Sequence, residues 1–175
     1  MQRELFIAIV GAALAVIFDV VISPNIAIYS ASPNAMVAYA IVIAMLLAGD
    51  AAFVIAFVLG MLCDLLGFGP VGAMPFLLVL AAFLVKRASG IFDNGTLFVP
   101  LVTLSVFILG VELLHAAFML GLGTNISAID AIVYLAVPCA AFDVVLGLIL
   151  YPVMSHFLLE RRTTLGSEPP TARLR

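Results

Sequence analysis

Long apolar stretches, separated by short polar or glycine-containing breaks, constrain the fold of this chain more than any other feature. Hydrophobic residues make up 66% of the 175 residues and charged residues only 10%, too few polar groups to cover the surface of a water-soluble domain. A helix needs about 20 apolar residues to cross a bilayer. The apolar stretches lie at about residues 5–22, 35–48, 51–66, 71–86, 97–121 and 130–157. The sequence therefore predicts an all-α integral membrane protein with six transmembrane helices in a compact bundle.

We expect one membrane domain over residues 1–162, followed by a polar tail. The tail, residues 163–175, has the sequence TTLGSEPPTARLR, which contains two prolines and few apolar residues. Such a composition cannot bury enough apolar surface to order itself, so the tail is predicted to be disordered.

The positions of Lys and Arg predict the orientation, because positively charged loops stay on the cytoplasmic side of a membrane. Arg3 precedes the first apolar stretch, Lys86 and Arg87 follow the fourth, and the other four arginines follow the sixth. The connections expected on the opposite side contain no Lys or Arg and comprise residues 23–34, 67–70 and 122–129. With six transmembrane helices, both termini and all seven positive charges lie in the cytoplasm.

Three of the apolar stretches carry small residues along one helical face, and each of these faces also carries an acid. Small residues let helix backbones approach closely, which favours helix packing in a membrane. The three sets are Ala8, Ala12, Ala15 and Asp19; Ala52, Ala56, Gly60 and Asp64; and Ala136, Ala140, Asp143 and Gly147. We therefore expect these acids to face the protein interior.

Ionisable residues within the predicted membrane spans are the candidate functional residues, because such residues are costly in lipid and usually serve a function. They are Asp19, Asp64, Glu112, His115 and Asp143. Apart from Lys86 at the very end of the fourth stretch, no Lys or Arg lies within the spans, so the acids cannot all form ion pairs within the chain. Two interpretations remain open. The acids are structural, either protonated or hydrogen-bonded to hydroxyls, backbone groups or water, or they form an outward-open pocket, a proton relay or a contact site for a polar group of a partner.

The sequence does not support catalysis, a bound metal or cofactor, or binding to nucleic acid. No Ser or Cys stands beside a histidine at nucleophile spacing, and no cluster of metal ligands such as HExxH is present. Cys63 and Cys139 lie in apolar stretches without a CxxC companion, so we interpret them as small apolar side chains. Seven Lys and Arg are too few for a nucleic-acid surface. We therefore expect a protein that is not an enzyme and binds no cofactor.

The central region of the chain resembles a known family. Residues 60–87 have the sequence GMLCDLLGFGPVGAMPFLLVLAAFLVKR. In the rod shape-determining protein MreD family, a glycine, a few apolar residues, Asp-Leu-Leu and a short glycine-rich turn precede Pro-Leu-Gly and another hydrophobic span. The matching residues are Gly60, Asp64, Leu65, Leu66, Pro70 and Gly72, with Gly67 in the turn and Val71 in place of the usual leucine.

The resemblance implies a non-catalytic subunit of the bacterial elongation machinery, located in the cytoplasmic (inner) membrane. Members of the family that the chain resembles work with the bitopic protein MreC. They act alongside the MreB filament, a RodA-type glycosyltransferase and a class B penicillin-binding protein in side-wall peptidoglycan synthesis. The family is similar in fold to the substrate-binding S-components of energy-coupling factor transporters. An S-component that captures a vitamin or metal ion in an outer pocket is therefore the alternative function, although the outer connections contain few aromatic residues and no cation.

Overall fold

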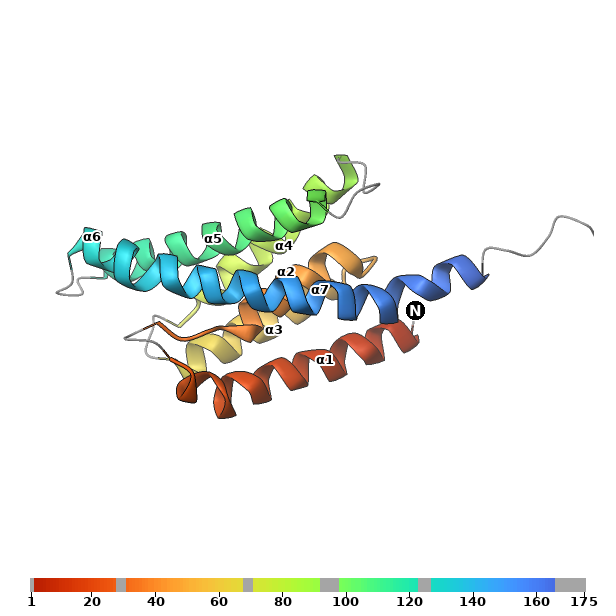
Figure 1. The fold of residues 1–175 in the computed structure, drawn as a ribbon, viewed down its shortest axis with the longest axis horizontal. Helices are drawn as coiled ribbons and strands as arrows, with labels where there is room; N and C mark the ends of the chain where they lie inside the picture. Colours follow the sequence, from red (N-terminus) through yellow and green to blue (C-terminus); the bar gives the residue numbers. More distant parts are fainter. Residues whose placement is uncertain (1, 28–30, 68–70, 92–97, 123–126, 166–175) are drawn as a thin grey trace, which may run out of the picture.

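Helices form nearly all of the protein in the computed structural model, which describes residues 2–27, 31–67, 71–91, 98–122 and 127–165 (Figure 1). The helices are α1 (Gln2–Val21), α2 (Ala35–Leu46), α3 (Ala51–Leu66), α4 (Ala73–Ile91), α5 (Phe98–Gly121), α6 (Ala128–Asp130) and α7 (Val137–Leu165). A short 3₁₀ turn, Ser23–Asn25, follows α1. The described residues contain no β-strand, so the prediction of an all-α protein is confirmed for them.

The helices differ in length and in how far they follow the apolar stretches. Three segments are long and apolar enough to cross a membrane: Gln2–Asn25, Phe98–Gly121 and Ala131–Leu158. Helices α2 and α3 are shorter apolar helices. Helix α2 ends before residue 48 because Leu47 is extended and Gly49 has a φ of 80°, a conformation that glycine adopts without strain. Helix α4 continues past Lys86 and Arg87, since charged residues end an apolar stretch without ending a helix.

Helix α6, a π-helical turn over Ala131–Ala136 and α7 follow one another as one continuous helix. Pro138 has no N–H and cannot complete the α-helical hydrogen-bond pattern. Just before it, the N–H of Val137 donates to the carbonyl of Ile132, five residues back, which widens the helix locally. Helix α7 ends at Leu165, so residues 163–165 of the tail predicted to be disordered are helical, and residues 166–175 lie outside the described part of the chain.

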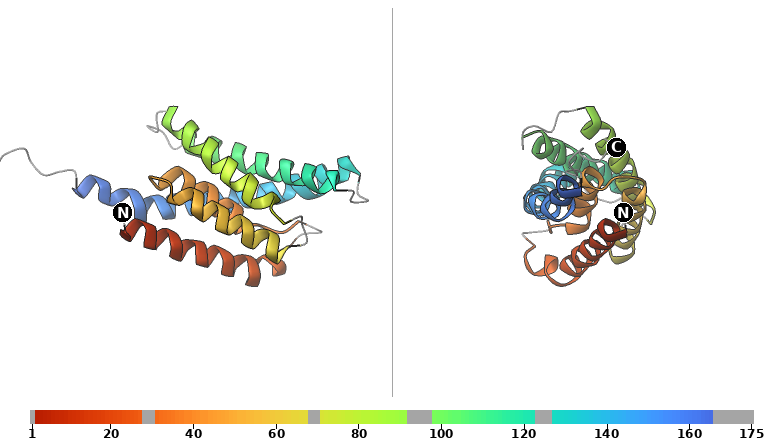
Figure 2. Two further views of the ribbon diagram at one scale, coloured as in Figure 1. Left: turned by 180° about the vertical axis from the view of Figure 1, so that it is seen from behind. Right: turned by 90° about the vertical axis from the view of Figure 1, so that its right-hand side faces the viewer.

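Helix α2 lies at the centre of the bundle. It packs against α1, α3, α4, α5 and α7, and all of its residues are buried except Met45, which is half-buried. A helix that is apolar on every side suits either the protein interior or lipid, and in this bundle α2 lies in the protein interior. Helix α1 lies at the edge of the bundle (Figure 2) and exposes most of its large apolar side chains.

The predicted small-residue faces lie at helix contacts. Tyr39 of α2 lies beside Gly11 of α1, and its hydroxyl donates to the carbonyl of Ala8 at 2.7 Å. The buried face of α1 therefore runs through Ala8, Gly11 and Ala15, whereas Ala12, which was predicted on this face, is only half-buried. The other two faces are buried as predicted and comprise Ala52, Ala56, Gly60 and Asp64 in α3, and Ala136, Ala140, Asp143 and Gly147 in the helix through α7.

The two ends of the bundle carry different charged groups. Helix α1 begins and α7 ends at the same end (Figure 1). At this end Lys86 donates a hydrogen bond to the carbonyl of Gly49, and its Nζ lies 4.8 Å from the centroid of the Phe53 ring. The opposite end holds the α1–α2 connection and the junction between α3 and α4, together with Asp19 and Asp64.

Candidate functional site

Asp64 connects the end of α3 to the start of α4. Its Oδ2 accepts a hydrogen bond from the N–H of Gly72 at 2.6 Å, and both carboxylate oxygens lie 3.3 Å from the nitrogen of Met74. The first N–H groups of a helix have no partner within the helix and carry partial positive charge. Asp64 is buried, so its carboxylate supplies these groups with hydrogen bonds where water is excluded.

The glycines of the same motif allow α3 and α4 to meet. A Cβ atom on Gly60 would lie only 2.5 Å from the Cα of Pro75, so only glycine fits this close backbone approach. Gly67 follows the last residue of α3, and its N–H donates to the carbonyl of Cys63 at 2.9 Å. Gly72 has a φ of 105°, in the region that favours glycine. The motif therefore specifies a tight junction between two helices.

The remaining motif residues do not take part in this junction or cannot be placed. Leu65 and Leu66 are 64% and 54% exposed, and Leu66 also lines the cavity described below. Pro70 lies outside the described residues. Among the described motif residues, the glycines and the aspartate are therefore the ones that form the junction between α3 and α4.

Two further acids bind the start of α2. Asp19 of α1 accepts hydrogen bonds from the N–H of Ala35 at 2.7 Å and from the N–H of Met36 at 2.8 Å, one with each carboxylate oxygen. Oδ1 of Asp143, in α7, accepts from the N–H of Asn34 at 2.5 Å. Acids from two helices that are far apart in sequence thus meet at the N-terminus of the central helix.

These contacts explain how the bundle holds acids without Lys or Arg between Arg3 and Lys86 or between Arg87 and Arg161. An unpaired backbone N–H in lipid costs several kcal/mol, and the N-terminus of a helix favours an anion. Each acid at a helix start therefore satisfies backbone groups that would otherwise be unpaired. This supports a structural role for Asp19 and Asp64, and for Oδ1 of Asp143.

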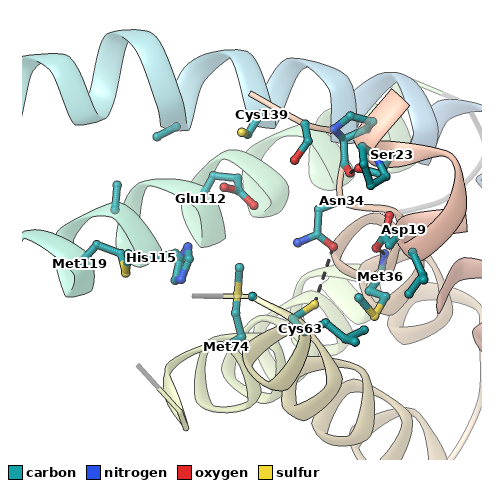
Figure 3. A pocket seen from close by; sticks show the side chains of 18 residues that line it. Asp19, Ser23, Asn34, Met36, Cys63, Met74, Glu112, His115, Met119 and Cys139 are labelled. Atoms are coloured by element: carbon teal, nitrogen blue, oxygen red, sulfur yellow. Dashed lines mark hydrogen bonds between the residues drawn. The ribbon is translucent and has the colours of Figure 1, made fainter. Parts of the chain in front are cut away.

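Glu112 of α5 is the acid without such a partner. Only 6% of its surface is exposed, and its Oε1 has no hydrogen-bond partner among the described residues. The Glu112 carboxyl interacts with the carboxyl of Asp143, whose Oδ2 also has no hydrogen-bond partner in the described chain. His115 lies on the neighbouring turn of α5 and is half-buried (Figure 3).

A cavity of about 480 Å³ lies where α1, α2, α3, α4, α5 and α7 approach one another (Figure 3). Its polar and ionisable lining residues are Asp19, Ser23, Ser32, Asn34, Glu112 and His115, and its sulfur-containing lining residues are Met36, Cys63, Met74, Met119 and Cys139. Of the predicted ionisable candidates, the structure thus brings Asp19, Glu112 and His115 together around one space, which the motif residues Leu66 and Gly67 also line. Asp64 and Asp143 do not line it. In the described part of the chain, no group of three or more His, Cys, Asp or Glu residues is arranged to hold a metal ion.

Asn34 links several of these residues and was missed by the sequence analysis. Its side-chain oxygen accepts from the N–H of Val37 at 3.1 Å and so caps α2, while its own N–H donates to Asp143. In Figure 3 its amide points into the cavity, and its oxygen lies 3.7 Å from the sulfur of Cys63. An asparagine directly before an apolar helix is a strong N-cap signal. That signal was available in the sequence just before Ala35.

Comparison with protein families identifies the chain. The family model described as rod shape-determining protein MreD matches residues 2–161. The comparison with curated proteins finds no match, and neither does the comparison with solved structures. The matched region includes the α3–α4 junction, the acids at the start of α2 and the cavity. The chain therefore belongs to the rod shape-determining protein MreD family.

Proposed function

We propose that this protein is a non-catalytic subunit of the bacterial cell-elongation machinery. Membership of the family implies a rod shape-determining membrane protein, and the match over residues 2–161 is the observation that carries the proposal. In this proposal the protein lies in the cytoplasmic membrane and crosses it six times, with both termini in the cytoplasm. It binds an MreC-like bitopic protein and through it supports MreB, a RodA-type glycosyltransferase and a class B penicillin-binding protein.

The structure supports a role in packing and assembly. Three of the four acids within the predicted spans bind backbone N–H groups at helix starts, where they hold helices together. Helix α1 presents exposed apolar side chains along its length, among them Phe6, Leu14 and Ile17, which suit contact with lipid or with a partner's membrane helix. These features need no chemistry on a substrate.

Depletion of the protein in its rod-shaped host tests the proposed function. Cells are expected to become round and to widen, because side-wall synthesis loses its spatial control. Expression of the chain from a second locus should restore rods, whereas a variant with Asp64→Leu should restore them poorly. Cells that keep their shape and width after complete depletion would contradict the proposal.

Purification from gently solubilised membranes tests the partner. An affinity-tagged chain should retain an MreC-like protein with one membrane span and a periplasmic coiled coil. A tagged membrane protein of similar size and unrelated function, purified in the same detergent, is the control. Recovery of a pair of ATPases in place of the MreC-like protein would favour the S-component function instead.

A further inference from the structure

The cavity between the helices contains a buried acid, Glu112, that interacts with Asp143 and has one carboxyl oxygen without a hydrogen-bond partner among the described residues. Glu112 lines the cavity and is 94% buried, and one of its oxygens has no hydrogen-bond partner in the described chain. Figure 3 shows its carboxyl group pointing into the cavity from α5, with the Asn34 amide pointing in from the start of α2. A buried polar group without a partner costs about 1 to 3 kcal/mol. A ligand with a complementary polar group would therefore gain a hydrogen bond by pairing with this oxygen.

The charges around the cavity indicate which kind of ligand fits. Asp19 also lines the cavity, and the Glu112 carboxyl interacts with that of Asp143. None of the described residues that line the cavity is Lys or Arg, so no side chain of the lining carries a permanent positive charge. Adjacent carboxyl groups disfavour each other's charged form, and a nearby cation relieves this cost. A positively charged group is the complementary ligand.

The volume of the cavity and its apolar lining residues indicate that the ligand is a small molecule with an apolar part, larger than a single ion. The volume of about 480 Å³ lies within the range of small-molecule sites, which hold a mainly apolar ligand with a few fixed polar contacts. Met36, Met74 and Met119 line the cavity, and methionine side chains adapt to apolar groups of irregular shape. Ser32 and Pro24 are exposed lining residues of the α1–α2 connection, so the cavity reaches the surface at that end of the bundle.

We propose that this cavity binds a molecule with a protonated primary amine on an apolar body, with the amine paired to Glu112 and the body packed against the methionines. A free amine and the amine headgroup of a phospholipid share this chemistry. The proposal goes beyond membership of the elongation machinery and does not depend on MreC.

Protection of the two natural cysteines measures occupancy of the cavity. Cys63 and Cys139 both line the cavity and are the only cysteines in the chain. The full chain, purified in detergent, is treated with methyl methanethiosulfonate, and the modification of each cysteine is followed by mass spectrometry. Hexylamine at ten times its dissociation constant should slow modification about tenfold, because only the free cavity then reacts. Hexanol, which has the same length and no charge, should give little protection at that concentration.

Two variants connect the effect to Glu112. Glu112→Gln keeps the size of the side chain and removes its charge, so protection by hexylamine should weaken about tenfold or more. Asp50→Asn removes an exposed acid at the other end of the bundle and should leave protection unchanged. If Glu112→Gln does not fold, the protection of the cysteines by hexylamine and by hexanol in the unaltered chain still tests whether the site requires a positive charge. Equal protection by the two compounds, no protection by either, or full protection in a folded Glu112→Gln variant would overturn the proposal.

Lipid nanodiscs then distinguish the two sources of the amine. If Cys63 and Cys139 are modified more slowly in phosphatidylethanolamine nanodiscs than in phosphatidylglycerol nanodiscs, without added hexylamine, the site binds a lipid headgroup. Equal rates in the two lipids, with protection by added hexylamine in both, assign it to a soluble amine. Equal rates of cysteine modification in the two lipids, with no protection by added hexylamine in either, would contradict the proposal that the cavity binds an amine in the lipid-embedded protein.

Discussion

Asp64 shows how one side chain can connect two helices. Its carboxylate lies at the end of α3 and accepts hydrogen bonds from the N–H groups of Gly72 and Met74 at the start of α4. An asparagine in its place keeps one oxygen acceptor, whereas a leucine keeps none and leaves both N–H groups buried and unpaired. The effect of a substitution at this residue should therefore depend on hydrogen-bonding capacity more than on charge.

We predict that Asp64→Asn lowers the free energy of unfolding by about 1 kcal/mol and Asp64→Leu by about 3 kcal/mol. Thermal unfolding of the purified variants in one detergent measures the difference. Asp50→Asn is the control, because Asp50 is exposed and its side chain makes no capping hydrogen bond. Equal unfolding temperatures for the Asn and Leu variants of Asp64 would show that its hydrogen bonds do not matter.

At the scale of helices, the close contact between α3 and α4 depends on the absence of a side chain at Gly60. A Cβ atom there would meet the backbone of Met74 and Pro75, at 2.5 Å from the Pro75 Cα, and backbone atoms cannot move aside as a flexible side chain can. Gly110 in α5 has open space in the same position, with no atom within 4 Å of a Cβ atom placed there. The two glycines thus form a matched pair.

Gly60→Ala is expected to lower the free energy of unfolding by roughly 2 to 3 kcal/mol, because the two helices must separate to admit the methyl group. Gly110→Ala should leave stability unchanged or raise it by up to about 1 kcal/mol, since alanine favours the helix more than glycine does. Unfolding of both variants in the same detergent makes the comparison. A Gly60→Ala variant as stable as Gly110→Ala would contradict the close approach of α3 and α4.

At the scale of the whole molecule, the separation of charge between the two ends of the bundle predicts its orientation in the membrane. Lys86 lies beside the connection between α2 and α3, at the end where α1 begins. Asn25 lies in the connection between α1 and α2, at the opposite end, and both Asn25 and Asp50 are exposed. Because positive charge stays in the cytoplasm, the end with Lys86 should be cytoplasmic.

Cysteine labelling tests this orientation. With Cys63 and Cys139 replaced by serine, Asn25→Cys should react with a membrane-impermeant maleimide added to intact cells or spheroplasts. Asp50→Cys should react only after the membrane is opened. Detergent-solubilised samples of both variants provide the control for reactivity. The opposite pattern of labelling would reverse the proposed orientation.

The described structure shows which features a local pattern predicts and which depend on contacts between helices. The apolar stretch 51–66 became α3 with the same bounds, because it contains no proline and only one glycine, Gly60, before Gly67. The stretch 35–48 was predicted as one of the two short spans, yet α2 is the buried centre of the bundle. Nothing in its own composition distinguishes it from an outer helix, because lipid and protein interior are both apolar.

By itself, the sequence determined that the chain is helical, apolar and a member of the rod shape-determining protein MreD family, because length, composition and a local motif carry that information. Only the tertiary structure decided how the acids differ. Asp143 meets Asn34 across 109 positions of sequence, and Asp19 meets α2 across a connection, so both bind a helix start, whereas Glu112 faces a cavity. A carboxyl group has the same chemistry at each position in the sequence, and its role follows from the backbone or the space that the fold places beside it.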